Sequence, residues 1–143
     1  MKTILKLFVL AALVFIAMPA SAQSSYGDYG YGYANQRENA SITFRNKSDY
    51  TMTLKILYLQ GGLYQTVVLY PHSAKTVEFS SSNTFKLKIK AVHNGYASYH
   101  KGGNFSVTCT PTEWTEGEMS FMLSTYGNGL GPKISSKEFE SNN

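Results

Sequence analysis

The stretch "TFKLKIKAVHNGYASYHKGG" (residues 84–103) decides the fold. Its apolar residues Phe85, Leu87 and Ile89 alternate with lysines, and a period of two predicts a β-strand with one face turned inward. At its centre stand Asn94 and Gly95, which both tolerate positive φ and give a strong short signal for a β-hairpin. This turn predicts the cross-strand pairs His93–Tyr96, Val92–Ala97, Lys90–Tyr99 and Lys88–Lys101.

The same alternation continues along most of the chain after residue 41. It is found in the segments "SITF", "YTMTLKILYL", "QTVVLY", "KTVEFS", "FSVTCT" and "EMSFMLS". No segment after the first 22 residues has a helical period over three turns, and Gly, Asn, Ser and Pro separate the strands. We therefore predict an all-β domain over residues 41–126, a small antiparallel β-sandwich of immunoglobulin-like type with about seven or eight strands.

A second hairpin is predicted around the Gly61-Gly62 pair. A two-residue loop there would set Ile56 opposite Val67 and Leu54 opposite Leu69, with both apolar pairs on one face. The opposite face is also apolar, since it carries Leu57, Leu59, Tyr64, Val68 and Tyr70. Two explanations stay open: the N-terminal arm or the C-terminal tail covers this face, or the face is a binding or assembly surface.

The first 22 residues predict export. Two lysines in "MKTILK" precede the apolar run "LFVLAALVFIAM", and Ala20-Ser21-Ala22 is a small-x-small cleavage pattern of a bacterial signal peptide. The apolar run is shorter than the roughly 20 residues of a membrane-spanning helix. We expect a mature chain without an integral membrane segment, located in the periplasm, on the outer surface or in the extracellular medium.

Two flexible ends are predicted around the sandwich. The arm over residues 23–40 alternates tyrosines with glycines, and Gly raises the entropic cost of ordering the backbone. This arm is either a disordered spacer or a self-associating segment whose tyrosines pair with the sheet edge of another copy. The glycine-rich "YGNGLGP" leads into residues 127–143, which we predict to be a flexible C-terminal tail.

Charge clusters locally although the net charge is small. The formal charge of +4 falls to +2 when the signal removes Lys2 and Lys6, so attraction to a polyanion would need local clustering. The predicted hairpin supplies it by placing four lysines and one tyrosine on one face: Lys86, Lys88, Lys90, Lys101 and Tyr99. Lys88 opposite Lys101 is unfavourable unless an anion lies nearby. An anionic polysaccharide or another polyanion would relieve the repulsion, whereas the alternative is an ordinary solvent-facing row of lysines.

Trp114 is a second candidate contact residue. It stands in "PTEWTEGE", a predicted loop with Glu113, Glu116 and Glu118 around it. An aromatic residue in such a loop either plugs the end of the sandwich or contacts a partner. The acidic loop of one molecule could also meet the lysine face of another and form head-to-tail contacts.

The sequence favours a protein that is not an enzyme. His72, His93 and His100 lie near predicted turns without a metal-ligand spacing, and Cys109 falls on an inward face. We expect no cofactor and no metal.

The predicted function is a secreted binding or assembly module of the bacterial cell envelope or extracellular space, of which adhesion is one form. One alternative is a structural subunit that self-associates through the arm. A second is a small secreted hydrolase or metal-dependent enzyme that uses His93, His100 or the glutamates of residues 113–118.

Overall fold

The computed structural model describes residues 3–7, 11–19, 39–124 and 129–143, with side chains for the last two ranges. Nine strands and one short helix lie in these residues. Their bounds are β1 Thr3–Leu7, β2 Ala11–Pro19, β3 Ala40–Asn46, β4 Thr51–Tyr58, β5 Leu63–Leu69, β6 Ala74–Phe79, β7 Asn83–His93, β8 Tyr96–Val107, β9 Glu113–Phe121 and α1 Ser136–Glu140.

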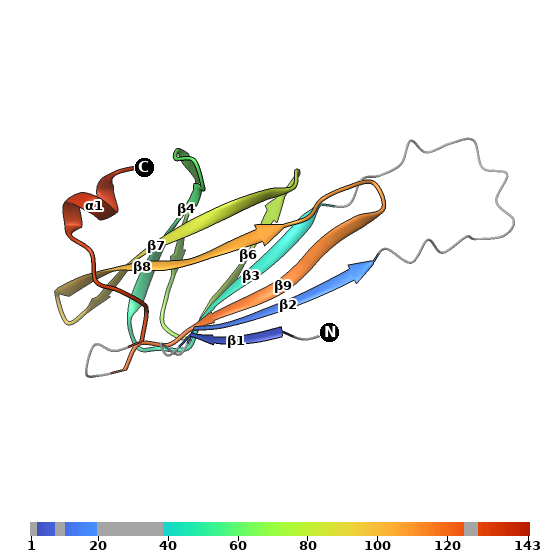
Figure 1. Cartoon of the computed structure of the whole chain (residues 1–143). Helices are drawn as coiled ribbons and strands as arrows, with labels where there is room; N and C mark the ends of the chain where they lie inside the picture. The colour runs from blue at the N-terminus through green and yellow to red at the C-terminus, as the bar shows by residue number, and fades with distance from the viewer. Residues whose placement is uncertain (1–2, 8–10, 20–38, 125–128) are drawn as a thin grey trace, which may run out of the picture.

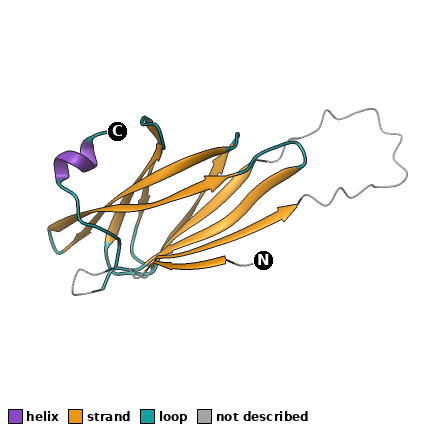
Figure 2. Ribbon diagram, viewed as in Figure 1, coloured by secondary structure: helices purple, strands orange, loops and turns teal. Residues whose placement is uncertain are grey.

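The strands form two layered sheets, which confirms the predicted β-sandwich (Figure 1 and Figure 2). The first sheet has the order β1-β2-β9-β3-β6 and the second the order β5-β4-β7-β8. The described residues from 39 onward contribute three strands to the first sheet and four to the second. The β3–β9 pair is parallel, whereas the other strand pairs in the described residues are antiparallel.

The core lies between the two sheets and is rich in aromatic rings. Phe44 and Phe105 meet edge to face with centroids 6.0 Å apart, and Phe85 lies 4.9 Å from Phe79. All four rings are at most 3 % exposed. Burying a side chain of this size stabilises a fold by about 1.5–3 kcal/mol, so packing holds the sandwich together without a disulfide.

The Asn94-Gly95 hairpin has the predicted register. Asn94 and Gly95 have φ values of 49° and 80°, as the turn requires, and Lys88 pairs with Lys101 and Lys90 with Tyr99. Further along, the register shifts between Lys86 and Lys88. A Cβ atom on Gly102 would lie 2.6 Å from the Cβ of Leu87, so only glycine fits at this close approach.

The register predicted for the Gly61-Gly62 hairpin is wrong by two residues. Leu54 pairs with Val67 and Met52 with Leu69. The two glycines do occupy the turn, with φ values of 109° and 97°, but the turn is longer and extends from Leu59. The longer turn shifts the pairing by three residues at Leu57–Leu63, and a bulge between Ile56 and Leu57 reduces the shift to two.

The bulge also changes which side chains lie on the outer face of β4 and β5. The sequence predicts Tyr64 on that face, yet its ring stacks on Phe79 inside the sandwich at a centroid distance of 5.1 Å. Leu57 is fully buried on the outer face, whereas Leu59 and Tyr70 are 45 % and 64 % exposed. The outer face is therefore covered over part of its area.

The predicted signal peptide contributes β1 and β2 in the full chain. β2 lies antiparallel beside β9, with residues 12–19 paired to residues 113–120 (Figure 1). Most of the predicted Tyr/Gly arm lies outside the described residues.

Candidate functional site

Five lysines gather on the outer face of the second sheet. Lys88 on β7 pairs with Lys101 on β8 and with Lys55 on β4, while Lys86 and Lys90 flank it along β7. We call this set (Lys55, Lys86, Lys88, Lys90 and Lys101) the lysine cross. Sequence reasoning placed four of them together and missed Lys55, because the pairing of β4 with β7 cannot be read from a local turn.

The C-terminal tail, here residues 129–143, packs on the lysine cross. Helix α1 lies beyond the second sheet, on the side away from the first (Figure 1). Phe139 anchors it, since this side chain is 4 % exposed and its ring lies 5.4 Å from that of Tyr99. The ammonium group of Lys55 lies 5.4 Å from the centroid of the same ring.

Two ammonium groups of the lysine cross bind the carbonyl end of α1. Lys88 Nζ donates to the carbonyl oxygens of Glu138 and Ser141 at 2.6 and 2.9 Å. Lys55 Nζ donates to those of Phe139 and Glu140 at 3.0 Å each. The last carbonyls of a helix lack internal donors and carry partial negative charge, so the two lysines cap α1.

The tail buries Lys88 although Lys101 stands opposite it on β8. Lys88 is 5 % and Lys55 8 % exposed. Burial lowers the pKa of Lys88, and the nearby Lys55 lowers it further, while Glu138 acts in the opposite direction. Lys88 therefore lies beneath the tail and not on an open docking face.

The other residues of the predicted lysine surface lie at the border of this cover. Lys86, Lys90 and Tyr99 are half-buried, and Lys101 is exposed. The Lys90 ammonium group lies 5.9 Å from the centroid of the Tyr99 ring, as expected from their pairing. The ring of Phe139 packs against the ring of Tyr99.

The C-terminal residues predicted as a flexible tail are packed over the part described. Leu130 is buried, and the amide of Lys101 donates to the Pro132 carbonyl at 2.8 Å. A Cβ atom on Gly131 would lie 2.4 Å from the Lys101 carbonyl oxygen, and its φ is +94°. Gly131 of "YGNGLGP", predicted to lie in the exit into a flexible end, thus permits close approach to β8.

Trp114 lies in strand β9 and not in the predicted loop. Its half-buried ring packs against the core, and its Nε1 donates to Glu116 Oε1 at 3.3 Å. Glu118, two residues further, pairs with Arg45 at 2.9 Å, and this hydrogen bond lowers the pKa of Glu118. The glutamates therefore lie in strand β9, with Glu116 and Glu118 on one face, and do not form a cation-binding loop.

His100 lies under the tail at the edge of β8. It is 1 % exposed, and its two ring nitrogens lie 3.2 Å from the Gly131 carbonyl oxygen and 2.9 Å from Ser98 Oγ. Burial lowers the pKa of His100, the Gly131 hydrogen bond opposes this, and Lys133 lowers it further. The neutral ring is therefore the form that the fold favours.

Stability is expected to fall as the pH drops below about 6.5, the ordinary pKa of histidine. The unfolded chain protonates His100 there before the folded chain does, so the contribution is complete above that pH and is lost as the pH approaches the lowered folded pKa. Urea unfolding at pH 7.5 and 5.5 measures the difference. His100→Gln should reduce the pH dependence, and an unchanged slope would contradict this role.

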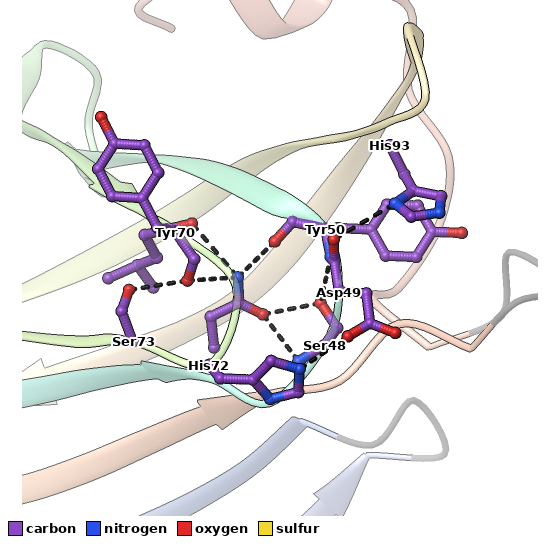
Figure 3. A network of polar contacts seen from close by, with 9 residues as sticks. Ser48, Asp49, Tyr50, Tyr70, His72, Ser73 and His93 are labelled. Atoms are coloured by element: carbon purple, nitrogen blue, oxygen red, sulfur yellow. Dashed lines mark hydrogen bonds and ion pairs between the residues drawn. The ribbon is translucent and has the colours of Figure 1, made fainter.

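A polar network closes one end of the sandwich, and sequence reasoning missed it (Figure 3). Its hub is the fully buried Asn46, whose Nδ2 donates to the Tyr50 carbonyl at 2.6 Å. Ser48 donates to Asn46 Oδ1 from its amide and its hydroxyl. In the same loop, Asp49 Oδ1 lies 2.7 Å from His72 Nε2.

The histidines predicted as an enzyme alternative do not share a site. The His93 ring contacts that of Tyr50 in a tilted arrangement at this end, with centroids 4.9 Å apart, whereas His100 lies under the tail. Within the described ranges no group of three or more His, Cys, Asp or Glu could hold a metal ion. Cys109 is buried on an inward face, as its pattern predicted.

No protein-family model matches the chain, and neither the curated proteins nor the solved structures give a significant match. In the part of the chain that the structure describes, no helix is both long and apolar enough to cross a membrane.

Proposed function

We propose that this chain is an exported, non-enzymatic β-sandwich that works by contact, as a binding or assembly module of the bacterial cell envelope or extracellular space. Its contact mode is strand addition at the outer edge of β9. The observation that carries the proposal is the pairing of β9. From residue 39 onward, its described strand partner is β3 alone, and β2 takes the other side in the full chain.

Cleavage after Ala22, as the sequence predicts, would remove β2. It would leave an eight-residue edge from Glu113 to Ser120 with unpaired backbone groups. Exposed edges of this kind pair readily with another extended chain. In the full chain this edge already pairs with the antiparallel strand β2, so its geometry suits another extended strand.

The other sheet edges are better protected in the described residues. The tail pairs with β8 through Lys101 and Tyr99. The edge strands β5 and β6 of the two sheets contact each other, and the Tyr64 hydroxyl of β5 donates to the Glu78 carbonyl of β6 at 2.7 Å. This difference favours β9 as the contact edge.

The donor strand is expected to lack negative charge along its paired residues. Two β9 strands paired around Gly117 would bring Glu116 and Glu118 opposite each other, and like charges in that position are destabilising. The Tyr/Gly arm of another copy is nearly neutral, and Tyr29, Tyr31 and Tyr33 alternate as in a strand. A self-associating structural subunit is therefore the preferred form of this proposal.

Concentration-dependent assembly of the processed protein tests the proposal. Light scattering after size exclusion is expected to detect oligomers, and amide hydrogen exchange in β9 should slow as they form. Strand β7 is the internal control, because β4 and β8 already pair with both of its edges. Replacing Tyr29, Tyr31 and Tyr33 with serine should weaken assembly. A monomer at every concentration, with unchanged exchange in β9, would remove the proposal.

A further inference from the structure

The lysine cross conflicts with the usual rules for a stable sheet face. Lys88 has lysines directly opposite it on both neighbouring strands, about 4.8 Å away, and others about 7 Å along its own strand. Like charges in these positions repel each other. Uncharged polar residues would keep the face equally compatible with water.

The tail answers this repulsion with neutral groups only. Lys55 and Lys88 are each more than nine-tenths buried, and their ammonium groups donate to carbonyl oxygens and the Ser141 hydroxyl. The salt bridges within the described residues are Arg45–Glu118 and His72–Asp49, so neither lysine has a carboxylate partner there. Well-packed apolar residues commonly replace buried charges without loss of stability.

Local rules are most often broken at functional sites. We propose that the lysine cross is a binding site for an acidic polysaccharide bearing sulfate or phosphate groups, and that the C-terminal tail is a built-in cover that competes with this ligand. The carbonyl oxygens of α1 occupy the positions where anionic oxygens would accept stronger, charge-assisted hydrogen bonds from the same ammonium groups.

The aromatic content of the site favours a glycan over a single-stranded nucleic acid. Proteins that bind single strands stack successive bases on several aromatic side chains. Among the described strand residues, one ring, Tyr99, lies over a lysine of the cross, Lys90. One ring can support the C–H face of a single sugar while the surrounding lysines bind its anionic substituents.

Release of the tail should therefore increase binding. Phe139→Ala removes the anchor between Tyr99 and Lys55, and Gly131→Ala disturbs the tail through a different contact, the close approach to the Lys101 carbonyl. Two independent variants guard against a folding defect in either. Amide hydrogen exchange of residues 130–142 reports whether the tail has been released.

Dextran sulfate is the probe and uncharged dextran its matched control. Both variants should bind dextran sulfate about tenfold or more tightly than the wild type, with a steeper salt dependence because two more ammonium groups become available. In the Phe139→Ala background, Lys88→Gln should reverse the gain. Lys75→Gln removes the same charge from the other sheet and should not.

Three results would overturn the inference. One is unchanged dextran sulfate binding although hydrogen exchange shows a released tail in both variants. Another is an equal loss with Lys75→Gln and Lys88→Gln, which would indicate general charge attraction. The third is tighter binding of single-stranded DNA than of dextran sulfate at matched charge, which would make the site a nucleic-acid site. None of these depends on assembly through β9.

Discussion

Replacing Asn46 with alanine is expected to lower the free energy of unfolding by about 3–5 kcal/mol, because several buried groups would lose their partners at once. Its side-chain amide donates to the carbonyls of Tyr50, Tyr70 and Leu69 at 2.6, 3.1 and 3.3 Å. Its Oδ1 accepts from the Ser48 amide and hydroxyl at 2.9 and 2.7 Å. An alanine methyl group can make none of these bonds.

Asn39→Ala is the matched control for this variant. Asn39 is an exposed asparagine just before β3, at the opposite end of that strand from Asn46, and its amide makes one long contact with Glu78 at 3.4 Å. Its removal should change the free energy of unfolding by less than about 0.5 kcal/mol. Urea unfolding of the three proteins gives the comparison. Equal, small losses for both variants would show that the Asn46 network does not hold the loop.

The Asn46 network could not be read from the sequence because its partners come from separate turns. Asn46 follows a strand in "TFRNKSDY" and resembles an ordinary polar loop residue. Its partners Leu69 and Tyr70 lie more than 20 residues away. A buried asparagine is recognisable only when the carbonyl groups around it are known.

Hairpin registers were predictable where the turn itself dictates the geometry. Asn94 and Gly95 both adopt positive φ in a two-residue turn, so every predicted pair beside them is present. Gly61 and Gly62 also adopt positive φ, but glycine fits many turns and does not fix the loop length. The side chains stayed on their faces until the bulge, since a shift of two residues preserves the alternation.

The cover on the lysine cross escaped prediction for a different reason. Helix α1 has five residues, too few to produce a helical period, and a helix of that length is unstable without tertiary contacts. Its contacts are with residues about 40 to 85 positions earlier in the chain. The pattern of alternating lysines was read correctly as one face, but a strand pattern does not reveal what packs on that face.

Replacing Phe85 with alanine is expected to lower the free energy of unfolding by about 3–5 kcal/mol, the usual cost of such a cavity in a well-packed core. Phe85 is 1 % exposed. Its ring centroid lies 5.4 Å from those of Tyr58 and Phe105 and 5.1 Å from that of Tyr64. These rings come from several strands of the second sheet, so the loss would not be confined to one hairpin.

Phe85→Leu separates the cavity from the loss of aromatic contacts. Leucine keeps most of the buried apolar volume, so this variant should cost roughly half as much or less. Tyr96→Ala is the surface control, because that ring is 82 % exposed and its removal should be nearly neutral. Urea unfolding gives the three values, and near-ultraviolet circular dichroism reports the tyrosine environment.

Tyr64 turns inward only because of the bulge at Ile56, and it reaches Glu78 of the first sheet through its hydroxyl. A cavity at Phe85 should therefore loosen the contact between the sheets beside β5. A loss below about 1 kcal/mol with an unchanged aromatic spectrum would mean that these rings do not pack as described.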